Sequence, residues 1–225
     1  MYPGKWASEF PEKAAITHAV SGETISYAQL NDRSNQLAQL MWAEGLRPGD
    51  HAAIFMENHL RYFEVVWAAL RSGLYLTTIN RYLTDEEAGY ILDNCEAKVL
   101  VTSSKLADVA ARLPDFAPNC SRWLMVDGPV DGYEAYETAI EAHPAEPLAD
   151  EPAGQFMLYS SGTTGRPKGI LRPLTGTTLH EDAGPVGALQ QALWGFDTDT
   201  VYLSPAPLYH SAPISFCTAT LALGG

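Results

Sequence analysis

The sequence predicts an α/β protein whose parallel β-sheet is flanked by helices. The first observation is alternation, because short apolar runs that suit strands take turns with segments whose apolar residues recur at helical spacing. The second is a pair of capping boxes, Ser26–Gln29 and Thr84–Glu87, which mark where two helices begin. With 46% hydrophobic residues among 225, the chain can bury a substantial core.

Residues 1–142 are expected to form the first α/β part. A hairpin over Ala15–Ser26, with its turn at Ser21-Gly22, precedes a helix that the first capping box opens and Gly45 can stop. The later elements are, in order, a strand His51–Met56, a helix over Tyr62–Leu70 ended by Gly73, a strand Leu74–Ile79, a helix from Thr84 through Leu92, a strand Lys98–Val101, a further helix and a strand Arg122–Val126.

Residues 143–154 form a connection rich in proline and acidic residues, which separates the first part from a second over residues 155–225. In the second part, a strand over Gln155–Tyr159 leads into a glycine-rich loop. A helix is expected within Thr175–Trp194, interrupted or preceded by the glycines at 184 and 187. A strand over Val201–Ser204 and a helix over Pro213–Leu223 complete the pattern.

Composition narrows the class of protein. The 27 acidic residues outnumber the 14 basic ones, and a net charge of -13 argues against general binding to nucleic acid or anionic membranes. The three cysteines Cys95, Cys120 and Cys217 form neither a metal pattern nor a disulfide framework, which favours a reducing cytoplasm. We expect no transmembrane segment, since the longest uncharged tract, residues 200–225, contains three prolines, and no signal peptide, since the N-terminus lacks an apolar core.

The glycine-rich segment Tyr159–Gly169, YSSGTTGRPKG, is the most informative part of the chain. Its glycines allow the backbone to approach a ligand closely, its hydroxyls and amides can donate hydrogen bonds, and its lysine adds positive charge. Such clusters also occur in plain surface loops. The stretch from Gln155 to His180, however, has no acidic residue although the chain is acidic, which favours a site for an anion such as a polyphosphate. The spacing is not that of a Walker A loop.

This segment resembles the phosphate-loop signature of the adenylate-forming superfamily, which includes acyl- and aryl-CoA synthetases, luciferases and peptide-synthetase adenylation domains. Four other segments resemble motifs of that family in the same order, namely Ser26–Asn31, Gly73–Leu83, Thr84–Leu100 and Pro205–His210. The resemblance implies parallel-sheet subdomains with flanking helices, as in the N-terminal portion of the large domain of an acyl-CoA synthetase of the fatty-acid–CoA ligase type, an AMP-dependent synthetase/ligase.

The resemblance also implies a two-step reaction. A carboxylate attacks ATP to give an acyl-adenylate and pyrophosphate, and the thiol of coenzyme A then takes the acyl group. Fixed donors aimed at the leaving phosphates would stabilise the transition state. In this sequence Ser160, Ser161, Gly162, Thr163, Thr164, Gly165 and Lys168 would bind the phosphates of ATP. Among them Lys168 and Thr164 would be catalytic, and either Ser160 or Ser161 would face Mg²⁺.

The segment ending at Tyr209 and His210 bears on the substrate. In the family, the matching aromatic–histidine pair lies by the acyl pocket, although a histidine hydrogen-bonded in the core is the alternative. Relatives that activate amino acids place an aspartate in this segment, whereas Pro205–Phe216 contains no acidic residue. Because an unpaired buried ammonium group is costly, the sequence favours a fatty or aromatic carboxylate.

The family's later motifs are not found in these 225 residues. They include the adenine-binding segment, the ribose-binding aspartate, the hinge and a C-terminal domain with a catalytic lysine. We therefore expect a truncated N-terminal part, inactive by itself, whose partner is the C-terminal half of the same protein. Two alternatives stay open: a non-catalytic nucleotide-binding module, and an acyl-AMP ligase that loads a carrier protein in place of coenzyme A.

Overall fold

The computed structural model describes residues 2–160, 166–179 and 184–225. Helices and strands alternate along most of the chain, which confirms the predicted α/β class. The helices are α1 (Pro3–Glu9), α2 (Tyr27–Ala43), α3 (Tyr62–Arg71), α4 (Asp85–Asn94), α5 (Ala107–Ala110), α6 (Tyr136–Glu141), α7 (Gly184–Trp194) and α8 (Ser211–Leu223), with short 3-10 turns at Ser104–Leu106 and Leu113–Asp115. The strands are β1 (Ala14–Thr17), β2 (Thr24–Ser26), β3 (His51–Phe55), β4 (Tyr75–Thr78), β5 (Ala97–Ser103), β6 (Arg122–Val126), β7 (Glu134–Ala135), β8 (Gln155–Phe156), β9 (Leu158–Ser160) and β10 (Lys168–Ile170).

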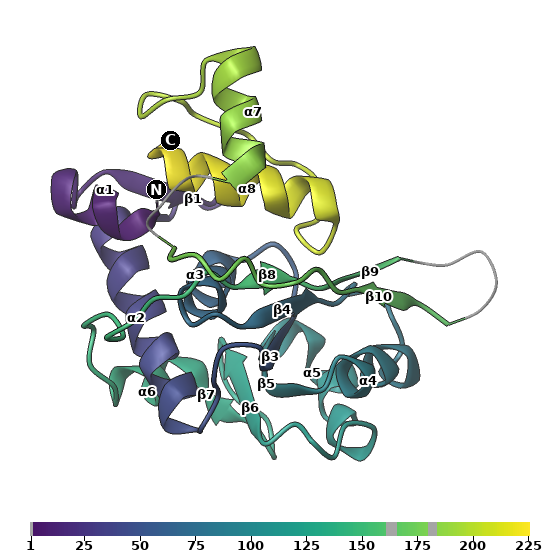
Figure 1. Ribbon diagram of the computed structural model, residues 1–225. Coiled ribbons are helices and arrows are strands. Elements are labelled where there is room, and N and C mark those ends of the chain that lie inside the picture. The colour runs from purple at the N-terminus through teal and green to yellow at the C-terminus, as the bar shows by residue number, and fades with distance from the viewer. Residues whose placement is uncertain (1, 161–165, 180–183) are drawn as a thin grey trace.

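Six parallel strands form the central sheet in the order β7-β6-β5-β3-β4-β8 (Figure 1). Its central strand β3 is buried on both faces, because Ala52 and Ile54 join one apolar cluster whereas Ala53 and Phe55 join another. The first cluster, here called the α3-side core, also contains side chains of α2, α3, α6 and α8. The second, the α4-side core, contains side chains of α4 and α5. This burial explains why the strands are apolar runs without a polar face.

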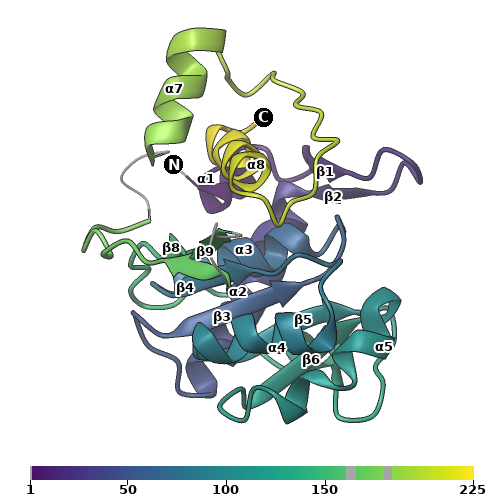
Figure 2. The ribbon, with the colours of Figure 1, turned by 90° about the vertical axis from the view of Figure 1, so that its right-hand side faces the viewer.

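Helices α7 and α8 form a further layer beyond the α3-side core, together with α1 and the β1–β2 hairpin (Figures 1 and 2). The N-terminal segment is fastened to the end of α8, since Trp6 Nε1 donates to the Ala222 carbonyl at 2.8 Å. The Tyr27 hydroxyl donates to the Gly225 carbonyl at 2.8 Å. No helix in the described ranges is both long and apolar enough to cross a membrane.

The connection over residues 143–154 lies against α2 and α3. Amide side chains of α2 donate to its backbone, as Asn35 Nδ2 does to the Ala145 carbonyl at 2.7 Å. Farther along, the buried Glu151 carboxylate accepts from Arg71 Nε at 2.6 Å. Strand β8 then pairs with β4 of the same sheet. The division into 1–142 and 155–225 stays a prediction, but the segment between the two parts is packed against the first.

Three sequence-based expectations differ from the structure. The predicted strand over Val201–Ser204 is wrong: these residues belong to no strand, and Val201 and Leu203 are 96% and 71% exposed. A run with high β-propensity forms a strand only beside a partner, and no described strand pairs with this one. Of the helix predicted within Thr175–Trp194, residues 175–179 are irregular and Gly184–Trp194 are helical. Finally, the end of the glycine-rich segment is strand β10, where a loop was expected.

Candidate functional site

The glycine-rich segment has a β-hairpin at its base. The chain continues from β8 through Met157 into β9, and β9 pairs with β10 in antiparallel fashion. The paired residues are Ser160 with Lys168 and Tyr159 with Gly169. Ser160 and Lys168 are therefore opposite each other where the hairpin opens. The other predicted phosphate contacts, namely Ser161, Gly162, Thr163, Thr164 and Gly165, lie outside the described residues.

The two faces of this hairpin have different surroundings. Met157 and Tyr159 pack on the α4-side core, whereas Phe156 and Leu158 pack on the α3-side core. Because side chains alternate along a strand, Ser160 and its partner Lys168 project on the α3 side, and both are exposed. That is the side on which α8 lies (Figures 1 and 2). The hairpin thus presents a hydroxyl and an ammonium group together on one face.

The segment before α8 is fixed at the carboxyl ends of β3 and β4. The Leu208 N–H donates to Asn58 Oδ1 at 2.9 Å, and Asn58 Nδ2 donates to the Ala206 carbonyl at 3.0 Å. Thr78, the last residue of β4, donates through Oγ1 to the Tyr209 carbonyl at 3.0 Å. These contacts place Tyr209 at the same end of β4 as the hairpin, on the side of the α3-side core, to which Leu208 belongs.

His210 stands at the N-cap position of α8, and its ring centroid is 4.3 Å from that of Tyr209. Its side chain is exposed and does not cap the helix, so the core-histidine alternative does not hold. The first turn of α8 contains no acidic residue. Its unpaired N–H groups and the helix dipole favour a nearby anion, as the basic hairpin does. In open α/β sheets, ligands bind outside the carboxyl ends of the strands, which is where both segments lie.

Arg166 is directed to the other side of the hairpin. Its guanidinium lies over the ring of Tyr90, 4.9 Å from the centroid. Arg166 lines a cavity of about 320 Å³ together with two acidic residues of α4, Glu86 and Asp93. The stretch from Gln155 to His180 contains no acidic residue, but Glu86 and Asp93 of α4 come close to its Arg166. They do so on the α4 side of the hairpin, whereas Lys168 projects on the opposite face.

Four residues that matter for this geometry were not identified from the sequence. Asn58 and Thr78 hold the segment before α8, and each lies at or just after the end of a predicted strand, so the carboxyl-end rule could have indicated them. Tyr90 and Asn94 contact the hairpin from α4, one helical turn apart. Nothing in the sequence signals that contact, because it depends on how α4 packs against the sheet.

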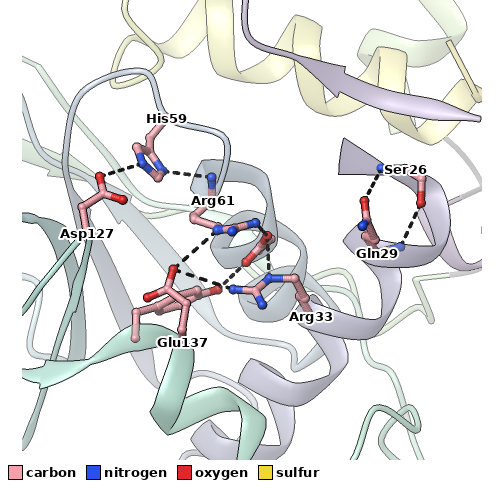
Figure 3. A network of polar contacts seen from close by, with 9 residues as sticks. Ser26, Gln29, Arg33, His59, Arg61, Asp127 and Glu137 are labelled. Carbon is pink, nitrogen blue, oxygen red and sulfur yellow. Dashed lines mark hydrogen bonds and ion pairs between the residues drawn. The ribbon is translucent and has the colours of Figure 1, made fainter. Parts of the chain in front are cut away.

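Polar contacts at the start of α3 form a second network (Figure 3). The Glu64 carboxylate accepts from Arg33 Nε at 2.9 Å, from Arg61 Nη1 at 3.0 Å and from the Tyr136 hydroxyl at 2.9 Å. His59 Nε2 lies 3.1 Å from Asp127 Oδ2. The other ring nitrogen of His59 accepts from the Arg61 N–H at 3.0 Å. The network joins α2, α3 and α6.

Among the described residues, no carboxylate or thiolate cage for a metal is found. Within residues 2–160, 166–179 and 184–225, no three His, Cys, Asp or Glu side chains come close enough together to hold an ion. Of the two serines considered for Mg²⁺, Ser160 has an exposed side chain beside the open end of the hairpin, and Ser161 is not described. A magnesium ion held mainly by phosphate oxygens and water would fit such a site, since Mg²⁺ commonly keeps several waters.

Comparison with known proteins assigns the chain to a family. The family model described as "AMP-binding enzyme" matches residues 4–225. A feruloyl-CoA synthase of Amycolatopsis is 31% identical over 100% of this chain and 42% of its own length. A fatty acid–[acyl-carrier-protein] ligase, ScoC, of Streptomyces coeruleorubidus is 30% identical over 67% of this chain and 28% of its own length.

Among solved structures, ATP-bound MatB from Rhodopseudomonas palustris superposes with a TM-score of 0.75 at 26% identity, covering 100% of this chain and 44% of that chain. The chain thus spans less than half the length of each of these proteins. A match over residues 4–225 together with a shared fold leaves no other assignment at the family level. The chain belongs to the AMP-binding enzyme family.

Proposed function

We propose that the whole protein activates a carboxylic acid with ATP, giving an acyl-adenylate and pyrophosphate, and passes the acyl group to the thiol of coenzyme A, giving a thioester and releasing AMP. The observation that carries the proposal is the shared position of two segments at the carboxyl end of β4. One is the hairpin that presents Ser160 and Lys168, and the other ends at Tyr209 and His210. Family membership and the ATP-bound relative support it.

The described residues fit a polyphosphate on charge and exposure. Lys168 supplies an exposed ammonium group that can follow the charge developing on the leaving phosphates, and Ser160 supplies a hydroxyl beside it. Residues 161–165 add the hydroxyls and backbone amides that the sequence assigns to the same phosphates, including Thr164. Mg²⁺ would neutralise part of the phosphate charge, and Ser160 or Ser161 would be one of its ligands.

The carboxylate is proposed to be fatty or aromatic. The segment from Pro205 to Phe216 has no acid that could pair with an ammonium group. In the structure Phe216 of this segment contacts aromatic residues outside it, since its ring lies 5.9 Å from that of Trp194 and 6.3 Å from that of Tyr202. Tyr209 and His210, just before α8, would then border the reacting carboxylate.

The test is ATP–pyrophosphate exchange by the whole protein with a panel of carboxylates, namely fatty acids of several lengths, aromatic acids such as ferulate, and amino acids. We expect exchange with fatty or aromatic acids and none with amino acids. The 225-residue chain alone is expected to give no exchange, because the later motifs are not among its residues. Absence of exchange with every carboxylate would overturn the proposal and favour a non-catalytic nucleotide-binding module.

A second acceptor is favoured by one relative, the ScoC ligase, whose name assigns it an acyl-carrier protein. Adding coenzyme A or a phosphopantetheinylated carrier protein to the preformed adenylate separates the two possibilities. Thioester formation with coenzyme A alone supports the main proposal. Thioester formation with the carrier alone supports the acyl-AMP ligase.

A further inference from the structure

We propose that helix α4 positions the phosphate-binding hairpin, with Asn94 and Tyr90 as positioning residues that hold β9 and the start of β10. This inference rests on the proposed function only in assigning a nucleotide to the hairpin. The anchoring itself is a matter of contacts between described residues. It explains how a two-stranded hairpin, which has little stability of its own, can keep its functional face in a fixed direction.

Three contacts join α4 to the two sides of the hairpin. The Tyr159 hydroxyl of β9 donates to Asn94 Oδ1 at 2.6 Å. The Tyr90 hydroxyl donates to the carbonyl of Pro167, the residue before β10, at 3.4 Å. Arg166 lies over the face of the same Tyr90 ring. Residues on both sides of the undescribed segment 161–165 are thereby tied to one helix.

A glycine in β10 makes room for the first of these contacts. Gly169 pairs with Tyr159 across the hairpin. A Cβ atom at position 169 would stand 3.0 Å from the Tyr159 ring and 2.4 Å from the Met157 methyl group. A side chain at this position would therefore clash with Met157 and press on the Tyr159 ring, whose hydroxyl reaches Asn94. The glycine is explained by this packing and needs no unusual backbone angle.

The α4 helix is a firm support. Its buried residues Ala88, Ile91 and Leu92 belong to the α4-side core, and its start is held by a complete capping box at Thr84 and Glu87. When Tyr159 is held on the α4 side, the alternation of the strand directs Ser160, and with it the paired Lys168, to the opposite face. The anchor therefore determines which way Ser160 and Lys168 project, although it lies outside the site.

The experiment compares Asn94→Ala, Tyr159→Phe and Tyr90→Phe, the double variant Asn94→Ala/Tyr159→Phe, and Tyr133→Phe in the whole protein. Tyr133→Phe is the matched control, because the Tyr133 hydroxyl donates to the Ala110 carbonyl at 2.9 Å in the same core but not to the hairpin. Two quantities are measured: kcat and KM for ATP in pyrophosphate exchange, and amide hydrogen exchange of β9 and β10. The second needs no activity.

We expect Asn94→Ala and Tyr159→Phe each to lower kcat/KM for ATP by roughly 3- to 10-fold, the size of one hydrogen bond, and to speed amide exchange in the hairpin. The double variant should be no worse than either single one, because both remove the same bond. Asn94→Asp, which keeps an acceptor for Tyr159, should restore most of the loss. Tyr90→Phe should also lower kcat/KM and speed amide exchange, but less strongly. The hydrogen bond that it removes is longer, and the phenylalanine ring still supports Arg166.

Three results would overturn the inference. The first is amide exchange of the hairpin in Asn94→Ala and Tyr159→Phe that is no faster than in Tyr133→Phe, and the second is additive losses of kcat/KM in the double variant. The third is faster amide exchange of the hairpin with unchanged kcat and KM for ATP. If the wild-type protein shows no pyrophosphate exchange, the proposed function fails. Amide exchange then still decides whether α4 anchors the hairpin, so the two failures are distinguishable.

Discussion

Among the residues assigned to ATP, Lys168 is the one whose surroundings are best defined. It is exposed, is paired across the hairpin with Ser160, and lies on the face opposite to Arg166 and the acids of α4. The structure thus separates two basic side chains that are neighbours in sequence. Lys168 faces the side of α8, whereas Arg166 packs on a tyrosine ring. Of the two, Lys168 is the one proposed to meet the phosphates of ATP.

Replacing Lys168 by alanine in the whole protein should slow adenylation by about 10²–10³-fold, because a preorganised donor to the developing charge is lost. The measurement is the rate of pyrophosphate release at saturating carboxylate. Lys105→Ala, which removes an exposed lysine from the turn after β5, serves as the control and should leave the rate unchanged. An unchanged rate for Lys168→Ala would contradict the assigned role.

Two of the cysteines, Cys95 and Cys120, are expected to be unreactive because they are buried. Burial raises the pKa of Cys95 to about 11 and that of Cys120 to about 12. The thiolate is the reactive form, so both should resist alkylation by iodoacetamide at pH 8 in the native protein and react once urea unfolds it. Mass spectrometry of the alkylated peptides measures this. Rapid native labelling of Cys95 at pH 8 would show that the raised pKa is wrong.

The same shifts predict a dependence of stability on pH. A thiol whose folded pKa lies above its unfolded value of about 8.5 contributes stability below that pH, and the contribution is lost as pH rises toward the folded pKa. We expect the urea midpoint to fall between pH 8 and pH 10. Cys95→Ala should show a smaller fall, because one group that ionises only on unfolding has been removed.

At the scale of elements, the starts of two helices were predicted correctly because the whole capping signal lies within a few residues. Both capping boxes are present with both of their hydrogen bonds, at Ser26–Gln29 (Figure 3) and at Thr84–Glu87. Helix α1 was missed although Pro3 stands in its first turn, a position that proline favours. Strand β10 was missed because its residues have no strand-like pattern; it exists because β9 pairs with it.

Thr84→Ala should lower the free energy of unfolding by about 1 kcal/mol, because the side-chain acceptor for the Glu87 N–H is lost at the start of α4. Urea denaturation followed by circular dichroism measures the change. Thr84→Ser keeps the hydroxyl and should retain most of the stability. If alanine and serine are equally well tolerated, the capping box does not contribute to stability.

At the scale of the whole molecule, the connection over residues 143–154 shows how tertiary contacts override composition. Its prolines and acids are typical of a linker, yet Glu151 is buried and forms an ion pair with Arg71, whose guanidinium also donates to the Asn31 carbonyl at 3.1 Å and to Ser34 Oγ at 2.8 Å. An acid-rich segment is thereby fixed between α2, α3 and β8, directly before the strand that leads to the hairpin.

Glu151→Ala should destabilise the protein by about 3–5 kcal/mol, because it leaves the buried Arg71 without its carboxylate. The double variant Arg71→Met/Glu151→Leu should recover much of this loss, since no charge then stays buried. Denaturant unfolding measures both. Glu9→Ala removes an exposed partner of Lys5 and should cost at most about 0.5 kcal/mol. A loss for Glu151→Ala as small as that of Glu9→Ala would show that the pair is not structurally important.

The sequence by itself determined the α/β class, the helix starts at Ser26 and Thr84, the positions of β3, β4, β5 and β6 along the chain, and the segment that binds phosphate in the proposed function. These features are encoded by neighbours in the chain: periodicity, caps and a glycine-rich composition. Tertiary structure alone decided that Val201–Ser204 is not a strand, that Asn94 and Tyr90 support the hairpin, and that Lys168 and Arg166 project on opposite faces. These outcomes depend on which segments meet in space, and local sequence patterns do not specify pairing between residues far apart in the chain.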